Sequence, residues 1–93
     1  MTAHVKILLH AMFKETAGQR EILQEVKPDS TLRDMLNALA EKYGKEFNSI
    51  IDPKTGQVSL DTLVMVNGKS ERKLDFQLKD KDVVMITVPV GGG

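Results

Sequence analysis

Residues 30–44 carry the clearest helical pattern in a sequence whose other apolar stretches mostly alternate as strands do. Ser30 or Thr31 can cap the start of this helix, and Asp34 falls in its first turn, where the helix dipole favours an anion. Gly44 can end it, because glycine takes the left-handed conformation without a Cβ clash. The apolar face has the i, i+3, i+4, i+7 spacing of an amphipathic helix and consists of Leu32, Met35, Leu36, Leu39, Ala40 and Tyr43. Such a stripe must be buried against another element.

Strand patterns lie on both sides of this helix. Residues 4–13 alternate, and a second strand is predicted over 20–26, after a polar hairpin turn at 14–19. The core face of the first strand is predicted to hold Val5, Ile7, Leu9, Ala11 and Phe13.

Two further strands are predicted in the second half of the chain, over 60–66 and 83–88. Between them, Asn67-Gly68 is typical of a type I′ turn and leads into a short segment at 71–74. We expect an irregular connection over 45–59, with one further helical turn possible around Phe47.

These elements predict an α+β domain, a mixed sheet with one main helix packed on one face. Ninety-three residues suffice for one core and not for two. Because one helix covers one face, apolar residues of the other parity should line an uncovered face. They are candidates for partner docking, with scattered surface hydrophobic residues as the alternative, and they are Leu8, Met12, Leu63, Met65 and Met85.

Composition excludes several functional classes. Thirteen basic residues balance thirteen acidic ones, so the sequence lacks the positive charge typical of a nucleic-acid binder. The absence of cysteine excludes disulfides and thiolate metal sites. No apolar run approaches the roughly 20 residues of a membrane span, and the first residues lack the pattern of a secretory signal. We therefore expect no nucleic acid or membrane partner and a cytoplasmic location.

Candidate catalytic and metal-binding motifs are weak. His4 and His10 on one strand would lie about 20 Å apart, too far to share an ion. Gly68-Lys69-Ser70 resembles the end of a phosphate-binding loop, but Leu63 occupies the position of the required earlier glycine. No nucleophile is paired with a base. We expect no metal and no catalysis by this chain alone.

The last residues, Val88-Pro89-Val90-Gly91-Gly92-Gly93, are the most unusual feature of the sequence. Pro89 should end the sheet, dividing a domain over 1–88 from a flexible tail over 89–93. Gly91, Gly92 and Gly93 lack side chains, so this thread could enter a narrow channel and present the Gly93 carboxylate to another protein. A flexible linker or an expression remnant is the alternative.

The order of these elements, together with the terminal glycines, resembles the β-grasp, ubiquitin-like sulfur carriers of the MoaD/ThiS family. The resemblance spans the chain and includes the archaeal ubiquitin-like relatives of these carriers. By its length and its ending, the chain is more similar to the small subunit of molybdopterin synthase (MoaD) than to the shorter thiamine carrier (ThiS), with an archaeal ubiquitin-like relative as the alternative. It rests on Val5 to Phe13, the helix start at 29–32, Val66-Asn67-Gly68, the turn at 78–84 and the end at 89–93.

This resemblance implies a protein that other enzymes use as a reagent. A ubiquitin-activating-type (MoeB-like) enzyme would adenylate Gly93 with ATP and magnesium, and a sulfur donor enzyme would convert the adenylate to a thiocarboxylate. A MoaE-like large subunit would then receive the tail for molybdopterin synthesis. This chain would bind no cofactor itself. The alternatives are a ubiquitin-like modifier joined through Gly93 to lysines, a carrier for thiamine synthesis or tRNA thiolation, or a plain interaction domain.

Overall fold

The computed structural model describes residues 3–89. Its larger elements are the strands β1 (Ala3–Leu9), β2 (Glu21–Val26), β5 (Leu63–Val66) and β7 (Val83–Thr87) and the helices α1 (Ala11–Ala17) and α2 (Leu32–Tyr43). The shorter ones are the 3-10 helix η1 (Lys45–Ser49) and the strands β3 (Ile51–Asp52), β4 (Gln57–Val58) and β6 (Lys69–Ser70).

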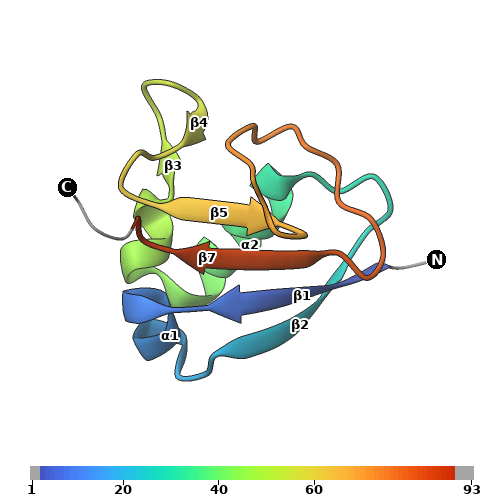
Figure 1. Ribbon diagram of the computed structural model, residues 1–93, viewed down its shortest axis with the longest axis horizontal. Coiled ribbons are helices and arrows are strands. Elements are labelled where there is room, and N and C mark those ends of the chain that lie inside the picture. The colour runs from blue at the N-terminus through green and yellow to red at the C-terminus, as the bar shows by residue number, and fades with distance from the viewer. Residues whose placement is uncertain (1–2, 90–93) are drawn as a thin grey trace.

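Five of these strands form one sheet in the order β2-β1-β7-β5-β6 (Figure 1). The central pair, β1 and β7, is parallel, and the outer pairs are antiparallel. β3 and β4 make a separate two-stranded hairpin. The predicted mixed sheet is therefore confirmed, with the last strand of the described chain at its centre.

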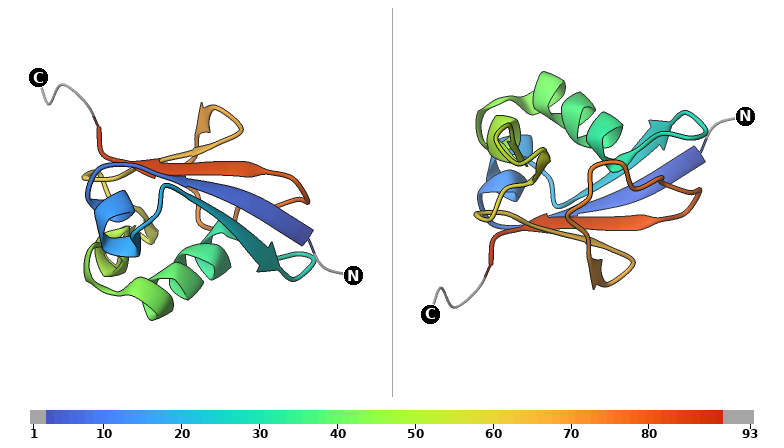
Figure 2. Two further views of the ribbon diagram at one scale, coloured as in Figure 1. Left: turned by 90° about the horizontal axis from the view of Figure 1, so that it is seen from below. Right: turned by 90° about the horizontal axis from the view of Figure 1, so that it is seen from above.

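The helices lie on one face of the sheet, and no helix of the described chain lies on the other face, called the uncovered face below (Figure 2). Alternate residues of each long strand point toward the helices and are buried, as the burial pattern of β5 and β7 shows. This layer forms one core, built mainly from Val5, Ile7, Leu9, Phe13, Leu32, Met35, Leu36, Leu39, Phe47, Ile50, Val64, Val84 and Ile86.

The start of α2 follows the prediction closely. Thr31 is its cap: the Thr31 side chain accepts a hydrogen bond from the Asp34 backbone N–H, and the Asp34 carboxylate accepts one from the Thr31 N–H. This reciprocal pair satisfies two of the N–H groups that a helix start leaves open. Gly44 ends the helix with φ 63° and ψ −146°. Its φ is positive as expected, but this ψ lies outside the left-handed helical region, in a region that only glycine enters readily.

The predicted strand over 4–13 is confirmed as far as Leu9 but wrong beyond it, and the polar turn predicted after it is wrong. β1 ends at Leu9, and Ala11, with φ 54°, turns the chain into α1. Phe13 is buried as expected, but from a helix, while Ala11 is exposed rather than buried. Gly18, with φ 77°, ends α1. β1 and β2 still pair antiparallel, but they are joined by a helix instead of a tight turn.

The second half of the chain also differs in its boundaries. β5 begins at Leu63, so Leu60 lies in a loop and is 76% exposed. The expected irregular stretch contains η1 and the β3–β4 hairpin, and the partner of β5 is Lys69–Ser70 instead of 71–74. The turn between them is confirmed: Asn67 and Gly68 both have positive φ, as a type I′ turn requires.

Side-chain hydrogen bonds fix the beginning of β7. Asp82, 8% exposed, accepts hydrogen bonds from the Asn67 side-chain amide and from the Lys79 backbone N–H. The Asn67 side-chain oxygen in turn accepts from the Val83 N–H at 2.9 Å. The hairpin turn and the charged turn before β7 are thus tied together where the central strand starts.

Candidate functional site

The C-terminal tail leaves from the middle of the sheet. β7 ends at Thr87, Val88 packs partly buried against the core, and Pro89 is exposed. The ribbon beyond β7 turns to the side of the sheet opposite α2 (Figure 2). Because β7 is paired on both sides, the point of exit is held by two neighbouring strands. The predicted reactive residues Gly91, Gly92 and Gly93 lie outside the described residues, so their roles stay predictions.

Two elements flank this exit. On one side, the His10 N–H donates to the Ile86 carbonyl at 3.1 Å and places the start of α1 beside the end of β7. On the other side, Leu63 pairs with Thr87, so the loop before β5 lies next to the exit. Each flank carries an exposed apolar side chain, Met12 in α1 at 37% and Leu60 in the loop at 76%.

Leu60 is a candidate site residue that the sequence does not identify, because the strand predicted over 60–66 includes it. A turn holds this loop: the Thr62 N–H donates to the Ser59 carbonyl, and the Asp61 N–H donates to the Ser59 hydroxyl. A serine followed two residues later by aspartate is a turn signal. This signal places the start of the strand after Asp61 instead of at Leu60.

The uncovered face of the sheet bears the predicted apolar row. Leu8 of β1 pairs with Met85 of β7, which pairs with Met65 of β5. Leu63 precedes Met65 by two residues on β5 and lies on the same face. All four are partly exposed and lie outside the hydrophobic core cluster. Their role in docking stays a prediction.

Met12 does not belong to this row, although the sequence analysis placed it there. It lies in α1, beyond the end of β1, because the strand stops at Leu9. It is exposed on α1, whose start lies beside the end of β7. The apolar surface available to a partner therefore includes the sheet and the two flanks of the exit.

A hollow of about 370 Å³ lies at the β1 end of this surface. Leu8 and His10 line it, with Lys14, Arg20 and Glu21 among the charged residues around it. Its rim therefore carries two cations and one carboxylate. An acidic side chain of a docking partner would find favourable charge there, next to the strand from which the tail leaves.

Polar contacts beside the exit hold α1 against η1. The Thr16 hydroxyl donates to a Glu46 carboxylate oxygen at 2.5 Å. This hydrogen bond, with one from the backbone of Glu46, lowers the pKa of the Glu46 carboxyl below its usual range. Phe13 and Phe47 pack edge to face beneath this contact, with ring centroids 5.3 Å apart.

Within residues 3–89, no three histidine or carboxylate side chains are grouped so that they could hold a metal ion. No helix in the same range combines the length and apolar character needed to cross a bilayer.

Comparison with known proteins places this arrangement in a family. Small archaeal modifier protein 3 of Haloferax volcanii is 32% identical over 92 residues, which cover 96% of this chain and 98% of that protein. The solution structure of the HVO 2177 protein from the same organism has a TM-score of 0.85 at 29% identity, covering 99% of this chain and 88% of that one.

A third similar protein is named for molybdopterin conversion instead of protein modification. The structure of a putative molybdopterin converting factor, subunit 1, from Pyrococcus furiosus has a TM-score of 0.79 at 27% identity and covers 95% of this chain and 99% of that one. These likenesses confirm the β-grasp fold. Residues 7–93 match the ThiS family. The chain therefore belongs to the ThiS family of ubiquitin-like, β-grasp proteins.

Proposed function

We propose that this chain is a ubiquitin-like protein modifier, which an activating enzyme joins through the Gly93 carboxylate to lysine side chains of target proteins. The observation that carries this proposal is the similarity over nearly the full length to a small archaeal modifier protein. This similarity favours the modifier role, which was an alternative in the sequence analysis, over the molybdopterin role, which the sequence favoured.

The structure supports this proposal through the way the tail is presented. The exit lies between two apolar flanks and beside an uncovered apolar sheet face. An activating enzyme that bound this surface would hold the domain while the tail reached its catalytic centre. Ordering each tail residue costs about 1–2 kcal/mol, which contacts on the domain would have to offset.

The chemistry belongs to the partner. A ubiquitin-activating-type enzyme, which uses ATP and magnesium, would attach AMP to the Gly93 carboxylate and release pyrophosphate. The amine of a target lysine would then attack the acyl carbon, form an amide and release AMP. This chain supplies the carboxylate, the slim tail and the docking surface, and it acts in the cytoplasm, where ATP is available.

A sulfur carrier is the second candidate, favoured by the similarity to the Pyrococcus furiosus protein. It would use the same adenylate, with sulfide instead of lysine displacing AMP, to give a thiocarboxylate on Gly93. The later partner would be a MoaE-like subunit if the sulfur goes to molybdopterin. The two roles share the first step and can coexist in one protein.

Mass spectrometry of cells that express the tagged chain tests the modifier role. Trypsin would leave the long segment after Lys81 on a target lysine, whereas a Val90→Arg variant would leave only three glycines, a remnant that is easy to identify. Remnants on lysines of other proteins are expected. The matched control is Val90→Arg without Gly92 and Gly93, which should leave none. Without remnants from the intact variant, the modifier proposal fails.

Intact-mass analysis distinguishes the second candidate. The chain is co-produced with its adenylating enzyme and a sulfur source. A mass gain that matches exchange of one oxygen for one sulfur at Gly93 would support the carrier. An unmodified terminus, under conditions that activate a known relative, would contradict it.

A further inference from the structure

Within residues 3–89, no strand pairs with the outer edge of β2. β2 pairs with β1 on one side and ends the strand order of the main sheet on the other. Figure 1 shows no element beyond this edge. An edge of this kind presents unpaired N–H and C=O groups, to which an extended peptide can add as a further strand.

The register of β1 and β2 identifies the backbone groups that face outward. The Leu9 N–H donates to the Arg20 carbonyl, so this pair is of the hydrogen-bonded type. Hydrogen-bonded pairs alternate along an antiparallel ladder, so Ile22 and Gln24 also face β1. The N–H and C=O groups of Glu21, Leu23 and Glu25 consequently point away from the sheet.

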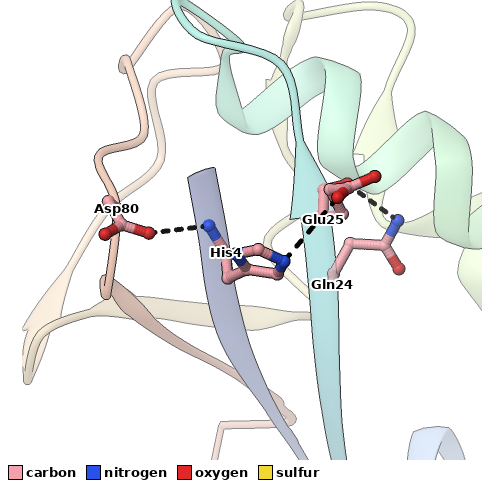
Figure 3. A network of polar contacts seen from close by, with 4 residues as sticks. All are labelled: His4, Gln24, Glu25 and Asp80. Carbon is pink, nitrogen blue, oxygen red and sulfur yellow. Dashed lines mark hydrogen bonds and ion pairs between the residues drawn. The ribbon is translucent and has the colours of Figure 1, made fainter. Parts of the chain in front are cut away.

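The side chains of these three residues form an acidic–apolar–acidic pattern on the uncovered face. Leu23 is 69% exposed, in contrast to the buried Ile22 beside it. Glu25 lies 3.7 Å from the His4 imidazole, and both side chains are about half exposed or more (Figure 3). A pair this open to water is weak and leaves the Glu25 carboxylate available to a second cation.

A hollow continues from this edge toward the helix. It has a volume of about 230 Å³ and lies between β2 and α2, with Val26, Met35 and Ala38 in its apolar wall. Alternate side chains of an added strand point to opposite faces. Those that do not meet Glu21, Leu23 and Glu25 would therefore point toward this hollow.

A peptide that pairs with this edge would have to displace one existing hydrogen bond. The Gln24 side-chain amide donates to the outward Glu25 carbonyl at 3.3 Å, as Figure 3 shows. This distance is beyond the usual range for such a bond, so a backbone N–H of a peptide could replace it. The other outward groups, at Glu21 and Leu23, have no side-chain hydrogen bond among the described residues.

We propose that the β2 edge is a docking site for an extended peptide segment of a partner protein with an apolar centre flanked by basic residues. The added strand would place its two cations opposite Glu21 and Glu25 and an apolar side chain opposite Leu23. The acidic pattern is the same in both directions, so the charge pattern favours neither parallel nor antiparallel pairing. This site does not depend on the proposed function, and it stays accessible while Gly93 is attached elsewhere.

Two synthetic peptides test the proposal, with the sequences Gly-Ser-Lys-Ile-Val-Ile-Lys-Ser-Gly and Gly-Ser-Glu-Ile-Val-Ile-Glu-Ser-Gly. Each is titrated into the ¹⁵N-labelled full chain and followed by amide chemical shifts and hydrogen exchange. Binding of the basic peptide should shift and protect the amides of Glu21, Leu23 and Glu25. The acidic peptide should bind about tenfold more weakly, because two cross-strand attractions become repulsions.

Variants on the same strand sharpen the test. A double charge reversal, Glu21→Lys with Glu25→Lys, should exchange the preference of the two peptides. Leu23→Pro removes an outward N–H without touching the ladder to β1 and should abolish binding, as should Leu23→Lys if the proline variant does not fold. Asn37→Lys on α2 is the matched control and should bind as the unchanged chain does.

Three results would overturn the proposal. The first is an absence of shifts at β2 with millimolar basic peptide, and the second is equal binding of both peptides. The third is self-association of the chain that Leu23→Pro abolishes, which would identify a second copy as the occupant. Attachment through Gly93 is assayed separately with the tagged chain, so failure of either proposal leaves the other standing.

Discussion

The two faces of the central sheet come from the same strands but are built differently. On the helix side, Val84 and Ile86 of β7 are fully buried. On the other side, their neighbours Met85 and Thr87 are partly exposed, and Met85 lies in an apolar row with Leu8 and Met65. The covered face uses branched side chains of fixed shape, while the uncovered row includes two methionines.

This difference separates stability from recognition. Burial of apolar surface against the helices supplies the free energy that holds the fold. The uncovered row contributes less to stability, so its apolar character must be explained otherwise. Methionine adapts to differently shaped surfaces, which suits a face that contacts more than one partner. The two faces should therefore respond differently to substitution.

Truncation in β7 should give the largest effect and the sharpest contrast. Ile86→Ala should lower the free energy of unfolding by about 2–5 kcal/mol, because it leaves a cavity between the central strand and the helices. Met85→Ala, one residue away on the other face, should cost about 1 kcal/mol or less. Urea denaturation measures both values. Equal losses would show that the two faces contribute alike.

A charge on the uncovered face should affect binding more than folding. Met65→Glu or Leu63→Glu should lower stability by no more than about 1 kcal/mol and weaken association with the activating enzyme by about tenfold or more. Asn37→Glu, exposed on α2, is the control and should change neither. Calorimetric titration gives the affinities. Normal binding by Met65→Glu would remove this row from the docking surface.

Deletion of the last two glycines should leave the fold unchanged. Because Gly92 and Gly93 follow the exposed Pro89, their loss should alter the free energy of unfolding by only a few tenths of a kcal/mol. It should abolish adenylation, measured by ATP–pyrophosphate exchange with the activating enzyme. A clear fall in melting temperature would instead show that the tail packs on the domain.

The smallest expected effect is the pH dependence of the contact between α1 and η1. The Thr16 hydroxyl lowers the pKa of Glu46 from its ordinary 4.5, so ionised Glu46 favours the folded chain above about that pH. This contribution disappears as the pH falls through the lowered pKa. Thr16→Val should therefore be slightly less stable at neutral pH, and the difference should shrink in acid. A difference that stays constant down to pH 2 would exclude this carboxyl as its source.

The sequence predicted those elements whose local signals agree with their packing. The helix after Thr31 has a capping box and a full apolar stripe, and Asn67-Gly68 specifies its turn by two positive φ values. α1 was not predicted because it has only seven residues and buries mainly Phe13. One buried apolar residue does not make a helical repeat that can be recognised in the sequence. The strand alternation through Leu9 fits a continuation to Phe13, because the Phe13 ring would be buried either from a strand or from a helix.

The chemistry assigned to the terminal glycines stays a prediction, and the surroundings of the site could be predicted only in part. The terminal glycines are visible in the sequence, and the alternation of β1, β5 and β7 identifies Leu8, Met65 and Met85 as residues of one parity. The neighbours of the tail exit depend on contacts across the fold. The Leu63–Thr87 pair and the hydrogen bond from His10 to Ile86 bring distant segments together, which no local pattern specifies.

The parallel pairing of β1 with β7 also has a consequence during protein synthesis. β1 leaves the ribosome well before its neighbour at residues 83–87. Until then the sheet lacks its central strand, and β5 has no connection to β1. A chain that stops short of β7 should remain open to proteases. A folded domain is therefore evidence that residues 83–87 have left the ribosome and taken the central position in the sheet.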